Sequence, residues 1–330
     1  MMPPFAWALP ILMISVQATT EYHCIDFPIE NQCVIEQMSY HPGQKITFPD
    51  GYQHLRIGFA KSLNGLESNI TTMDNTLYEA MHRPAIVEMT NVGMQRLIVP
   101  TKLLLGNFAD NAIFSLEVDR TETYKITFLD LDNNQLPNIN NISALINLET
   151  IHLRGNAIEA IDRSVFAPLI KLKRLYLRYN QFSTLPWTVL PSTLVHLDCY
   201  LGSLESVDFR NVSLPALEYL NLEKNDITAL NVTQLLHAAP KLKEAYLSYN
   251  PIHSDQLDEI LRVLKERNIT HNDGDQYEYC FDDDQYVDGE CVKQVAHVSK
   301  WKAALLTVIS VMVGVLVVVI LYWVFKQINR

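Results

Sequence analysis

The sequence has few of the residues that several protein classes require. Glycine is scarce, at 11 of 330 residues, which excludes a collagen-like repeat. Only five cysteines are present, too few for a small scaffold held together by disulfides. Basic residues are outnumbered, because 26 Lys and Arg stand against 37 Asp and Glu and leave a formal net charge of −11. A chain with this acidic balance lacks the basic surface that nucleic-acid binding needs, so we expect no nucleic-acid partner.

Motifs of catalysis are also missing. The sequence has no His-Glu-x-x-His, no Gly-x-Ser-x-Gly, no phosphate-binding loop, no Rossmann glycine pattern and no Cys-x-x-Cys. Its ten histidines are scattered and imply no set of metal ligands. We therefore expect no enzymatic activity, no metal site and no cofactor.

Charged side chains are absent from the N-terminal segment. Residues 1–18 contain an apolar run from Phe5 to Val16 and end in small residues, as the core and cleavage site of a signal peptide do. We predict a cleaved signal peptide over residues 1–18, with an uncleaved N-terminal anchor as the alternative.

Charge is absent again near the C-terminus. The uncharged stretch from Ala303 to Phe325 is long enough to cross about 30 Å of hydrocarbon, which predicts a transmembrane helix over residues 301–325 and a cytoplasmic tail over 326–330. Together with the signal peptide, this predicts a single-pass type I protein of the plasma membrane with its body outside the cell. Small residues share one face of the predicted helix and are a candidate contact for a lateral membrane partner or a second copy: Ala303, Thr307, Ser310 and Gly314.

Between these ends the sequence repeats. Six consecutive segments fit the pattern L-x-x-L-x-L-x-x-N-x-L with few departures, and one of them, Leu172–Leu185, reads LKRLYLRYNQFSTL. The asparagine of the pattern recurs at intervals of 22 to 25 residues, if Gly202 is counted as a departure in its column. The asparagines are Asn134, Asn156, Asn180, Asn225 and Asn250.

This pattern resembles the leucine-rich-repeat family. The resemblance implies an α/β solenoid, a horseshoe with a parallel β-sheet on its concave side. In each unit the L-x-L stretch is expected to be a short strand with its leucines inside, and each asparagine is expected to pair backbone groups of adjoining coils. Gly202 has no amide, so we expect a local irregularity there. We assign residues 51–252 to repeats, with 51–125 irregular because the strands expected around Leu55, Val87 and Leu116 do not keep the spacing.

Four cysteines flank the repeats, with Cys24 and Cys33 before them and Cys280 and Cys291 after them. They permit three pairings. A stack of about eight strands would separate the two pairs by about 40 Å, beyond the reach of a disulfide, so we predict Cys24–Cys33 and Cys280–Cys291. The fifth, Cys199, occupies an inward position and is expected to be a buried, unreactive thiol.

The flanks of the repeats are assigned as caps. Residues 19–50 are an expected N-terminal cap, and residues 253–299 an expected C-terminal cap and acidic stalk, which includes a predicted helix over 254–267. The stalk is rich in Asp and Glu, but their spacing does not fit a calcium-binding loop, so we expect a solvated segment. Five sequons predict N-glycosylation at Asn69, Asn141, Asn211, Asn231 and Asn268.

The outward positions of the predicted strands are the candidate ligand-binding surface. They carry tyrosine and arginine, which are over-represented in binding hot spots, although tyrosine is also simply a good strand residue. His152 and His196 are expected to face outward here, in different columns. The candidate binding residues are Tyr176, Arg178, Tyr179, Tyr200, Tyr219, Tyr246 and Tyr249.

Over residues 20–299, the phrasing of the repeats and the cap cysteines are similar to those of the insect leucine-rich-repeat immune proteins of mosquitoes, of their short transmembrane type. The resemblance implies a protein or microbial ligand on the concave face and a role in innate-immune recognition, or as a co-receptor without its own signalling domain. A cell-adhesion or matrix-attachment protein is the alternative. One departure is that a predicted membrane span stands where secreted members carry coiled coils and extra cysteines.

Overall fold

The computed structural model describes residues 19–25, 31–58, 68–272, 284–287 and 290–293. The chain divides into two units, residues 1–272 and 273–330, which we describe separately. In the second unit the described residues form an antiparallel hairpin of β18 (Asp284–Val287) and β19 (Glu290–Lys293).

Several predicted features lie outside the described residues. They are the signal peptide over 1–18, the Cys280 half of the second disulfide, most of the acidic stalk, the transmembrane helix over 301–325 with its small residues, and the tail over 326–330. Among the helices that the structure does describe, none combines the length and the apolar character needed to cross a membrane.

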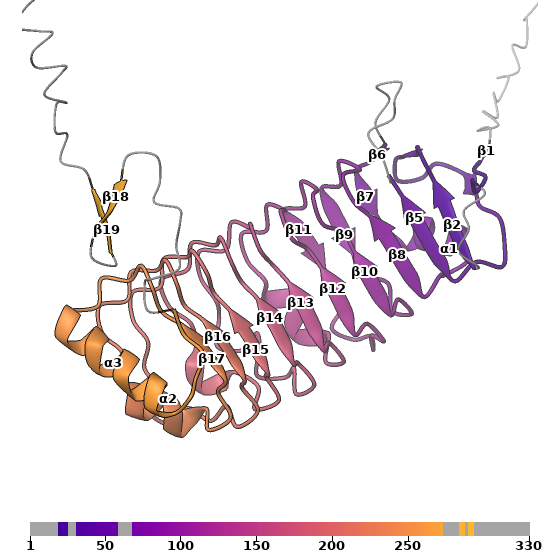
Figure 1. The fold of residues 1–330 in the computed structure, drawn as a ribbon. Helices are drawn as coiled ribbons and strands as arrows, with labels where there is room; N and C mark the ends of the chain where they lie inside the picture. The colour runs from indigo at the N-terminus through magenta and orange to yellow at the C-terminus, as the bar shows by residue number, and fades with distance from the viewer. Residues whose placement is uncertain (1–18, 26–30, 59–67, 273–283, 288–289, 294–330) are drawn as a thin grey trace, which may run out of the picture. The chain divides into compact units, whose positions relative to one another are not determined.

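One sheet of ten short parallel strands runs along the first unit (Figure 1). Each strand pairs with the next coil of the chain, which confirms the predicted solenoid with a parallel sheet. In chain order the strands are β2 (Gln32–Ile35), β5 (His54–Ile57), β8 (Ile86–Met89), β10 (Leu105–Asn107), β12 (Phe128–Asp130), β13 (Thr150–His152), β14 (Arg174–Tyr176), β15 (His196–Asp198), β16 (Tyr219–Asn221) and β17 (Glu244–Tyr246).

The middle residue of each three-residue strand in this sheet points into the core of the solenoid. Ile151, Leu175 and Leu197 are directly opposite one another in register and are fully buried. The residues on either side of them point outward, as the two-residue period of a strand requires. A single coil could not bury its leucines, whereas the stack shares one continuous apolar core.

The irregular N-terminal coils differ from the expectation at one strand. Leu116 lies not in the ten-stranded sheet but in β11 (Ser115–Glu117), which forms a separate parallel sheet with β9 (Arg96–Ile98) and β7 (Thr72–Met73). The strand that precedes β12 in the main sheet is β10, centred on Gly106. A Cβ at Gly106 would lie 2.7 Å from the Phe108 ring, so the packing leaves no room for the leucine that the pattern leads one to expect.

Helices are few and short in the described residues. They are α1 (Asn75–Ala80), the 3-10 helices η1 (Asn140–Ala144) and η2 (Trp187–Val189), α2 (Val232–Ala238) and α3 (Ser254–Glu266). The last of these matches the helix predicted over 254–267. It closes the C-terminal end of the solenoid by burying Ile260 and Leu264 in the shared core.

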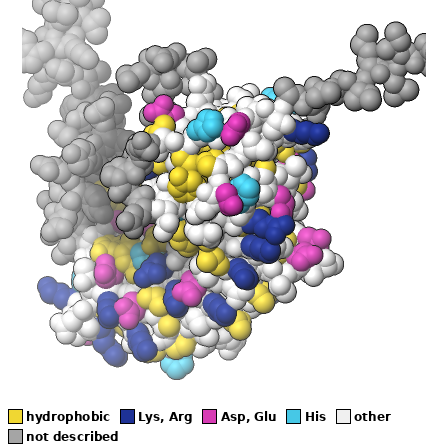
Figure 2. All heavy atoms as spheres, turned by 90° about the vertical axis from the view of Figure 1, so that its right-hand side faces the viewer, with side chains coloured by type: hydrophobic (Ala, Val, Ile, Leu, Met, Phe, Trp, Pro, Cys, Tyr) yellow, Lys and Arg dark blue, Asp and Glu magenta, His cyan; other side chains and the backbone are white. Residues whose placement is uncertain are grey.

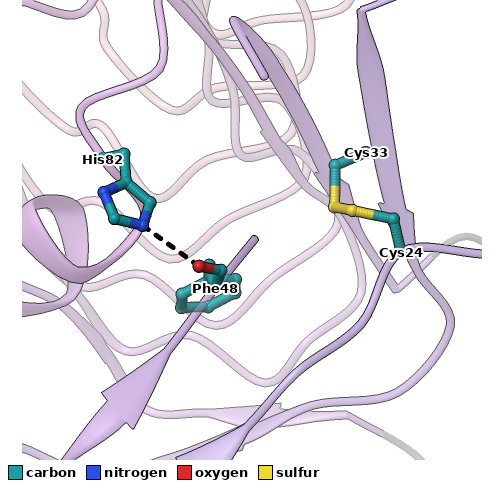
Figure 3. The surroundings of a disulfide bond; sticks show 4 residues. All are labelled: Cys24, Cys33, Phe48 and His82. Atoms are coloured by element: carbon teal, nitrogen blue, oxygen red, sulfur yellow. Dashed lines mark hydrogen bonds between the residues drawn. A yellow bond between two sulfur atoms is a disulfide. The ribbon is translucent and has the colours of Figure 1, made fainter. Parts of the chain in front are cut away.

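The N-terminal end is closed by the predicted disulfide between Cys24 and Cys33, which the structure confirms (Figure 3). Cys33 belongs to β2, so the bridge ties the end of the chain to the first strand of the main sheet. Nearby, the Nε2 atom of His82 lies 3.0 Å from the carbonyl oxygen of Phe48. Two small parallel pairs also lie in this region: β1 (Thr20–Glu21) with β4 (Ile46–Thr47), and β3 (Ser39–Tyr40) with β6 (Asn69–Ile70).

On the face shown in Figure 2, acidic and basic side chains are interspersed.

Candidate functional site

Buried asparagines hold each coil against the next. Asn156 is representative: its Oδ1 accepts a hydrogen bond from the Leu136 N–H (3.0 Å), and its Nδ2 donates to the Leu131 carbonyl (2.9 Å). These backbone groups lie inside the solenoid, where an unpaired group would be costly. Equivalent contacts are made by Asn134, Asn180, Asn225 and Asn250.

A sixth asparagine of this kind, Asn111, was not anticipated from the sequence. Its Oδ1 accepts from the Val92 and Met94 N–H groups, and its Nδ2 donates to the Met89 carbonyl at 2.7 Å. It lies 23 residues before Asn134, and this interval was the signal that could have found it. The strand of its coil reads Leu-Gly-Asn rather than L-x-L, which hid the unit.

The residue before each of these asparagines has a left-handed backbone. The φ angle is 57° at Tyr179, 53° at Lys224 and 59° at Tyr249. This conformation turns the chain out of the strand. Tyr179 and Tyr249 stand at that turn and are 40% and 38% exposed, which is large for aromatic side chains that touch the rest of the protein.

The expected irregularity at Gly202 is present. The Tyr179 N–H donates to two carbonyls of the next coil, Tyr200 and Leu201, where other coils use one. In addition, a Cβ on Gly202 would lie 2.8 Å from Oδ1 of Asn225, so the coil leaves no room for a side chain at this position. The coil has therefore adapted to glycine, and the solenoid continues through it.

The outward side chains of the ten strands and of the residues just after them form what we call the strand face. Six rings cross this face in an unbroken row, which we call the ring stripe. Successive ring centroids lie 5.4, 4.3, 4.7, 4.0 and 5.6 Å apart. The rings belong, in order, to Phe128, His152, Tyr176, His196, Tyr219 and Tyr246. Rings at these separations attract one another, so each fixes the orientation of its neighbours.

A second group lies beside the ring stripe, where the chain leaves the strands. The guanidinium of Arg178 lies 4.6 Å from the centroid of the Tyr200 ring, and the Lys224 ammonium lies 5.2 Å from that of Tyr249. Arg154 lies over Tyr179 at 5.0 Å. We call these six residues the cation–tyrosine cluster: Arg154, Arg178, Lys224, Tyr179, Tyr200 and Tyr249. Such contacts keep both partners in place and present charge on a hydrophobic surface.

Burial shapes the charges of the strand face. Asp198 is almost fully buried, and this burial raises the pKa of its carboxyl, while the guanidinium of Arg178, with Nε 3.5 Å from Oδ2, opposes the rise. Burial also lowers the pKa of His196 from 6.5 to about 4, so the ring is neutral at pH 7. The ring stripe is therefore uncharged at its centre at neutral pH.

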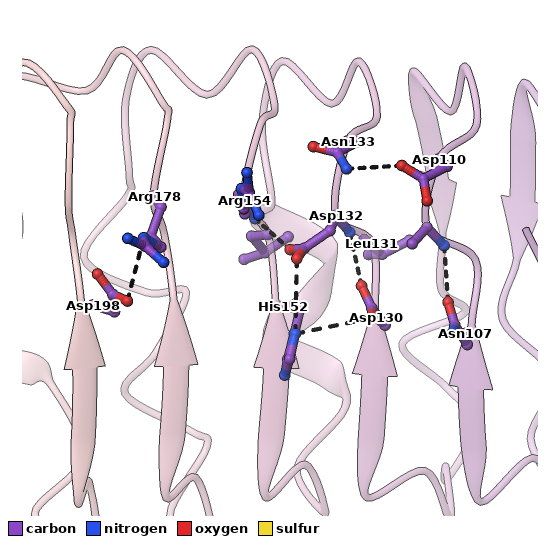
Figure 4. Close-up of polar contacts among 12 residues, drawn as sticks. Asn107, Asp110, Asp130, Leu131, Asp132, Asn133, His152, Arg154, Arg178 and Asp198 are labelled. Carbon is purple, nitrogen blue, oxygen red and sulfur yellow. Dashed lines mark hydrogen bonds and ion pairs between the residues drawn. The ribbon is translucent and has the colours of Figure 1, made fainter. Parts of the chain in front are cut away.

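Two carboxylates and an imidazole converge at one end of the ring stripe (Figure 4). His152 Nδ1 lies 3.9 Å from Oδ2 of Asp130 and 3.8 Å from Oδ2 of Asp132. The ligand atoms of all three residues lie within 4.8 Å of one another. The sequence analysis expected no third ligand for His152. The register of the strands supplies two from the preceding coil, because Asp130 is directly opposite His152.

The structure brings together all seven residues predicted to bind a ligand. Tyr176, Tyr219 and Tyr246 belong to the ring stripe, and the other four belong to the cation–tyrosine cluster. The sequence analysis missed Phe128 and the two histidines as ring partners, and Arg154 and Lys224 as cations. Their outward positions are visible in the repeat, but several of the contacts join residues that are not opposite each other in register, such as Tyr176 and His196, and the repeat pattern does not show these pairs.

The predicted glycosylation sites lie off the ten-stranded sheet. Asn69, Asn211 and Asn268 are exposed. Asn231 is also exposed, and its Oδ1 caps α2 by accepting from the Gln234 N–H. Asn141 is half-buried and its Nδ2, the atom that would carry a glycan, donates to the Leu116 carbonyl at 2.8 Å.

The stacked coils, their buried asparagines and the parallel sheet define a leucine-rich-repeat solenoid. Within it, residues 146–198 match the family model described as "Leucine rich repeat". These residues contain β13, β14 and β15 and three of the six rings of the ring stripe, His152, Tyr176 and His196.

Two curated proteins share part of the sequence. Lumican of Bos taurus is 32% identical over 132 residues, which cover 38% of this chain and 37% of lumican. Adenylate cyclase of Schizosaccharomyces pombe (strain 972 / ATCC 24843) is 26% identical over 275 residues, which cover 77% of this chain and 15% of the cyclase. The chain thus spans well under half the length of these relatives.

Two solved structures are similar in fold. The Toll–Spatzle complex of Drosophila, described as a hub in development and innate immunity, is 17% identical with a TM-score of 0.50 and covers 67% of this chain and 35% of that one. The leucine-rich-repeat domain of APL1B is 18% identical with a TM-score of 0.48 and covers 78% and 86%.

Proposed function

We propose that this chain binds a protein ligand on its strand face, through the ring stripe and the cation–tyrosine cluster. The observation that carries the proposal is the unbroken row of six rings on the outward side of the sheet. A leucine-rich-repeat solenoid needs its leucines inside, but nothing in its packing needs rings outside. A row of outward rings is therefore best explained by contact with a partner.

The contacts within the strand face also favour tight binding. Ordering a flexible side chain at an interface costs about 0.5–1.5 kcal/mol. Here Arg178 is already held by Asp198 and Tyr200, and Tyr176 is held between His152 and His196. Much of the free-energy cost of ordering these side chains therefore falls on folding and not on binding. A ligand binds to a surface that is already ordered. Tyrosine and arginine in such a surface are the residue types that dominate binding energies.

The positions of the predicted glycosylation sites are consistent with ligand binding on the strand face. None of the five predicted sites lies in a strand of the ten-stranded sheet. Glycans at those positions would leave the strand face uncovered.

We further propose that the chain is an innate-immune recognition protein or co-receptor, held at the plasma membrane by the predicted helix over residues 301–325. The resemblance of its repeats to insect immune proteins supports this role. The Toll–Spatzle complex, which has a similar fold and is described as a hub in innate immunity, is in line with this role.

Capture with the purified, glycosylated chain tests the proposal. The chain is incubated separately with host body fluid, host cells and whole bacteria, and the retained material is identified. Retention of bacteria, or of one soluble host protein, supports immune recognition. Retention only of host cells or matrix replaces that role with adhesion.

The same capture locates the surface. The double variant Tyr179→Ala/Tyr200→Ala is expected to lose the retained ligand, because it removes two tyrosines of the cation–tyrosine cluster. Phe114→Ala is the matched control, since Phe114 is 53% exposed and lies next to β11, outside the main sheet. Equal loss in both variants, or in neither, would refute binding through the strand face.

A further inference from the structure

The Asp130, Asp132 and His152 side chains surround a gap that hydrogen bonds do not fill. The Nδ1 atom of His152 stands 3.8 and 3.9 Å from one oxygen of each carboxylate, beyond hydrogen-bond distance. All three side chains are partly open to solvent, with 16–27% of their surface exposed. The gap is therefore small, polar and accessible.

Each side chain of this group is held in place by contacts that leave its free atom directed at the gap. Oδ1 of Asp130 accepts from the Asp132 N–H at 2.9 Å, and Oδ1 of Asp132 accepts from the Arg154 N–H at 2.7 Å. Both carboxylates thus keep Oδ2 for the gap (Figure 4). The His152 ring is fixed between the rings of Phe128 and Tyr176. Orientation of ligands by surrounding contacts of this kind is typical of metal sites.

The negative charge of the group is not balanced by a cation. In the described part of the chain, neither Asp130 nor Asp132 forms an ion pair with a lysine or arginine. Asp198 differs: it occupies the column of Asp130 three strands further along the sheet and pairs with Arg178. Asp110, one coil earlier, adds a third carboxylate to the field that acts on Asp130. The site therefore attracts a positive charge that no lysine or arginine among the described residues provides.

We propose that Asp130, Asp132 and His152 bind one divalent transition-metal ion, with zinc as the best-fitting probe. One imidazole nitrogen and two carboxylate oxygens are ligands that zinc accepts. Metal–ligand bonds of about 2.1 Å in a tetrahedron place ligand atoms about 3.4 Å apart, so the distances from His152 need to shrink by only about half an ångström. Three protein ligands leave a fourth position open to water.

Titration calorimetry of the purified full-length chain with zinc chloride, after treatment with EDTA, tests the proposal. One equivalent is expected to bind, and Asp130→Asn, Asp132→Asn and His152→Gln are each expected to weaken that binding by more than about tenfold. Asp162→Asn and His237→Gln are the matched controls, because both residues are exposed and lie away from the strand face. Thermal melts of every variant without metal establish that it is folded.

A spectroscopic readout separates this site from adventitious binding. Cobalt(II) substituted for zinc should give the visible absorption of a four-coordinate nitrogen- and oxygen-ligated ion, and the His152→Gln variant should lose it. Absence of binding, or binding that the three site variants leave unchanged, would overturn the proposal. The result does not depend on whether the strand face binds a protein, since no partner is present in either measurement.

Discussion

The imidazole ring of His196 lies flat against the phenol ring of Tyr219, with centroids 4.0 Å apart and an angle of 6° between the planes. The two residues are directly opposite in register on β15 and β16. Burial, helped by the positive charges around it, keeps the pKa of His196 at about 4 and the ring neutral at pH 7. The stack therefore joins the two halves of the ring stripe without introducing a charge.

The stability of the chain should depend on pH through His196. In the unfolded chain His196 binds a proton near its ordinary pKa of 6.5, whereas in the folded chain it does so only near 4. Unfolding is therefore favoured as the pH falls from 6.5 to 4, and this loss of stability is complete below 4. Urea melts between pH 7 and 4 should show a smaller fall in the free energy of unfolding for His196→Gln than for the unmodified chain. Parallel pH curves would show that His196 titrates normally.

The buried asparagines should be costly to remove. Asn180→Ala leaves the Ile158 N–H and the Leu177 carbonyl without their partner inside the solenoid, and should lower the free energy of unfolding by about 1–3 kcal/mol. The control Asn140→Ala truncates an exposed side chain and should change it by less than about 0.5 kcal/mol. Urea melts measure both. A loss at Asn140 as large as that at Asn180 would contradict the role given to the buried amides.

Restoring the repeat pattern at Gly202 should destabilise the protein. From comparison with the other coils alone, Gly202→Asn would be expected to raise the stability of the solenoid. In the structure a Cβ at this position would lie 2.8 Å from Oδ1 of Asn225. That amide is held in place, because its Oδ1 accepts from the Leu204 N–H and its Nδ2 donates to the Cys199 carbonyl. Overpacking of this kind costs about 1–3 kcal/mol. A higher midpoint in urea for Gly202→Asn would show that the coil can make room for a side chain at this position.

The sequence predicted most of the fold because the repeated residues are those that pack between the coils. Leucines that enter one shared core and amides that pair one set of backbone groups must recur at the spacing of the coils. Leu175 and Asn180 could therefore be placed from the sequence alone. The inward position of Gly106 could not, because a glycine packed against Phe108 stands where the pattern has a leucine, and the interval of 23 residues to Asn134 was the one signal for Asn111.

The sequence predicted which residues belong to the candidate site but not which of their side chains are in contact. Tyr176 and Tyr219 were visible as outward residues of their strands. Their link through His196 depends on which rings meet between neighbouring strands, and that depends on side-chain directions as well as register. The group of Asp130, Asp132 and His152 was missed for a related reason, since its ligands come from two coils and match no motif along the chain.

Photo-crosslinking from Tyr200 tests the binding role of the strand face most directly. A photo-reactive phenylalanine analogue is placed at Tyr200, and at Phe114 in a control chain, and each is irradiated in the host fluid or with the cells that the capture experiment identifies. A single partner protein should be joined to the chain through position 200 and not through position 114. Crosslinking of the same partner from position 114 alone, or of no protein from position 200 while the chain still captures its ligand, would show that the ligand binds elsewhere.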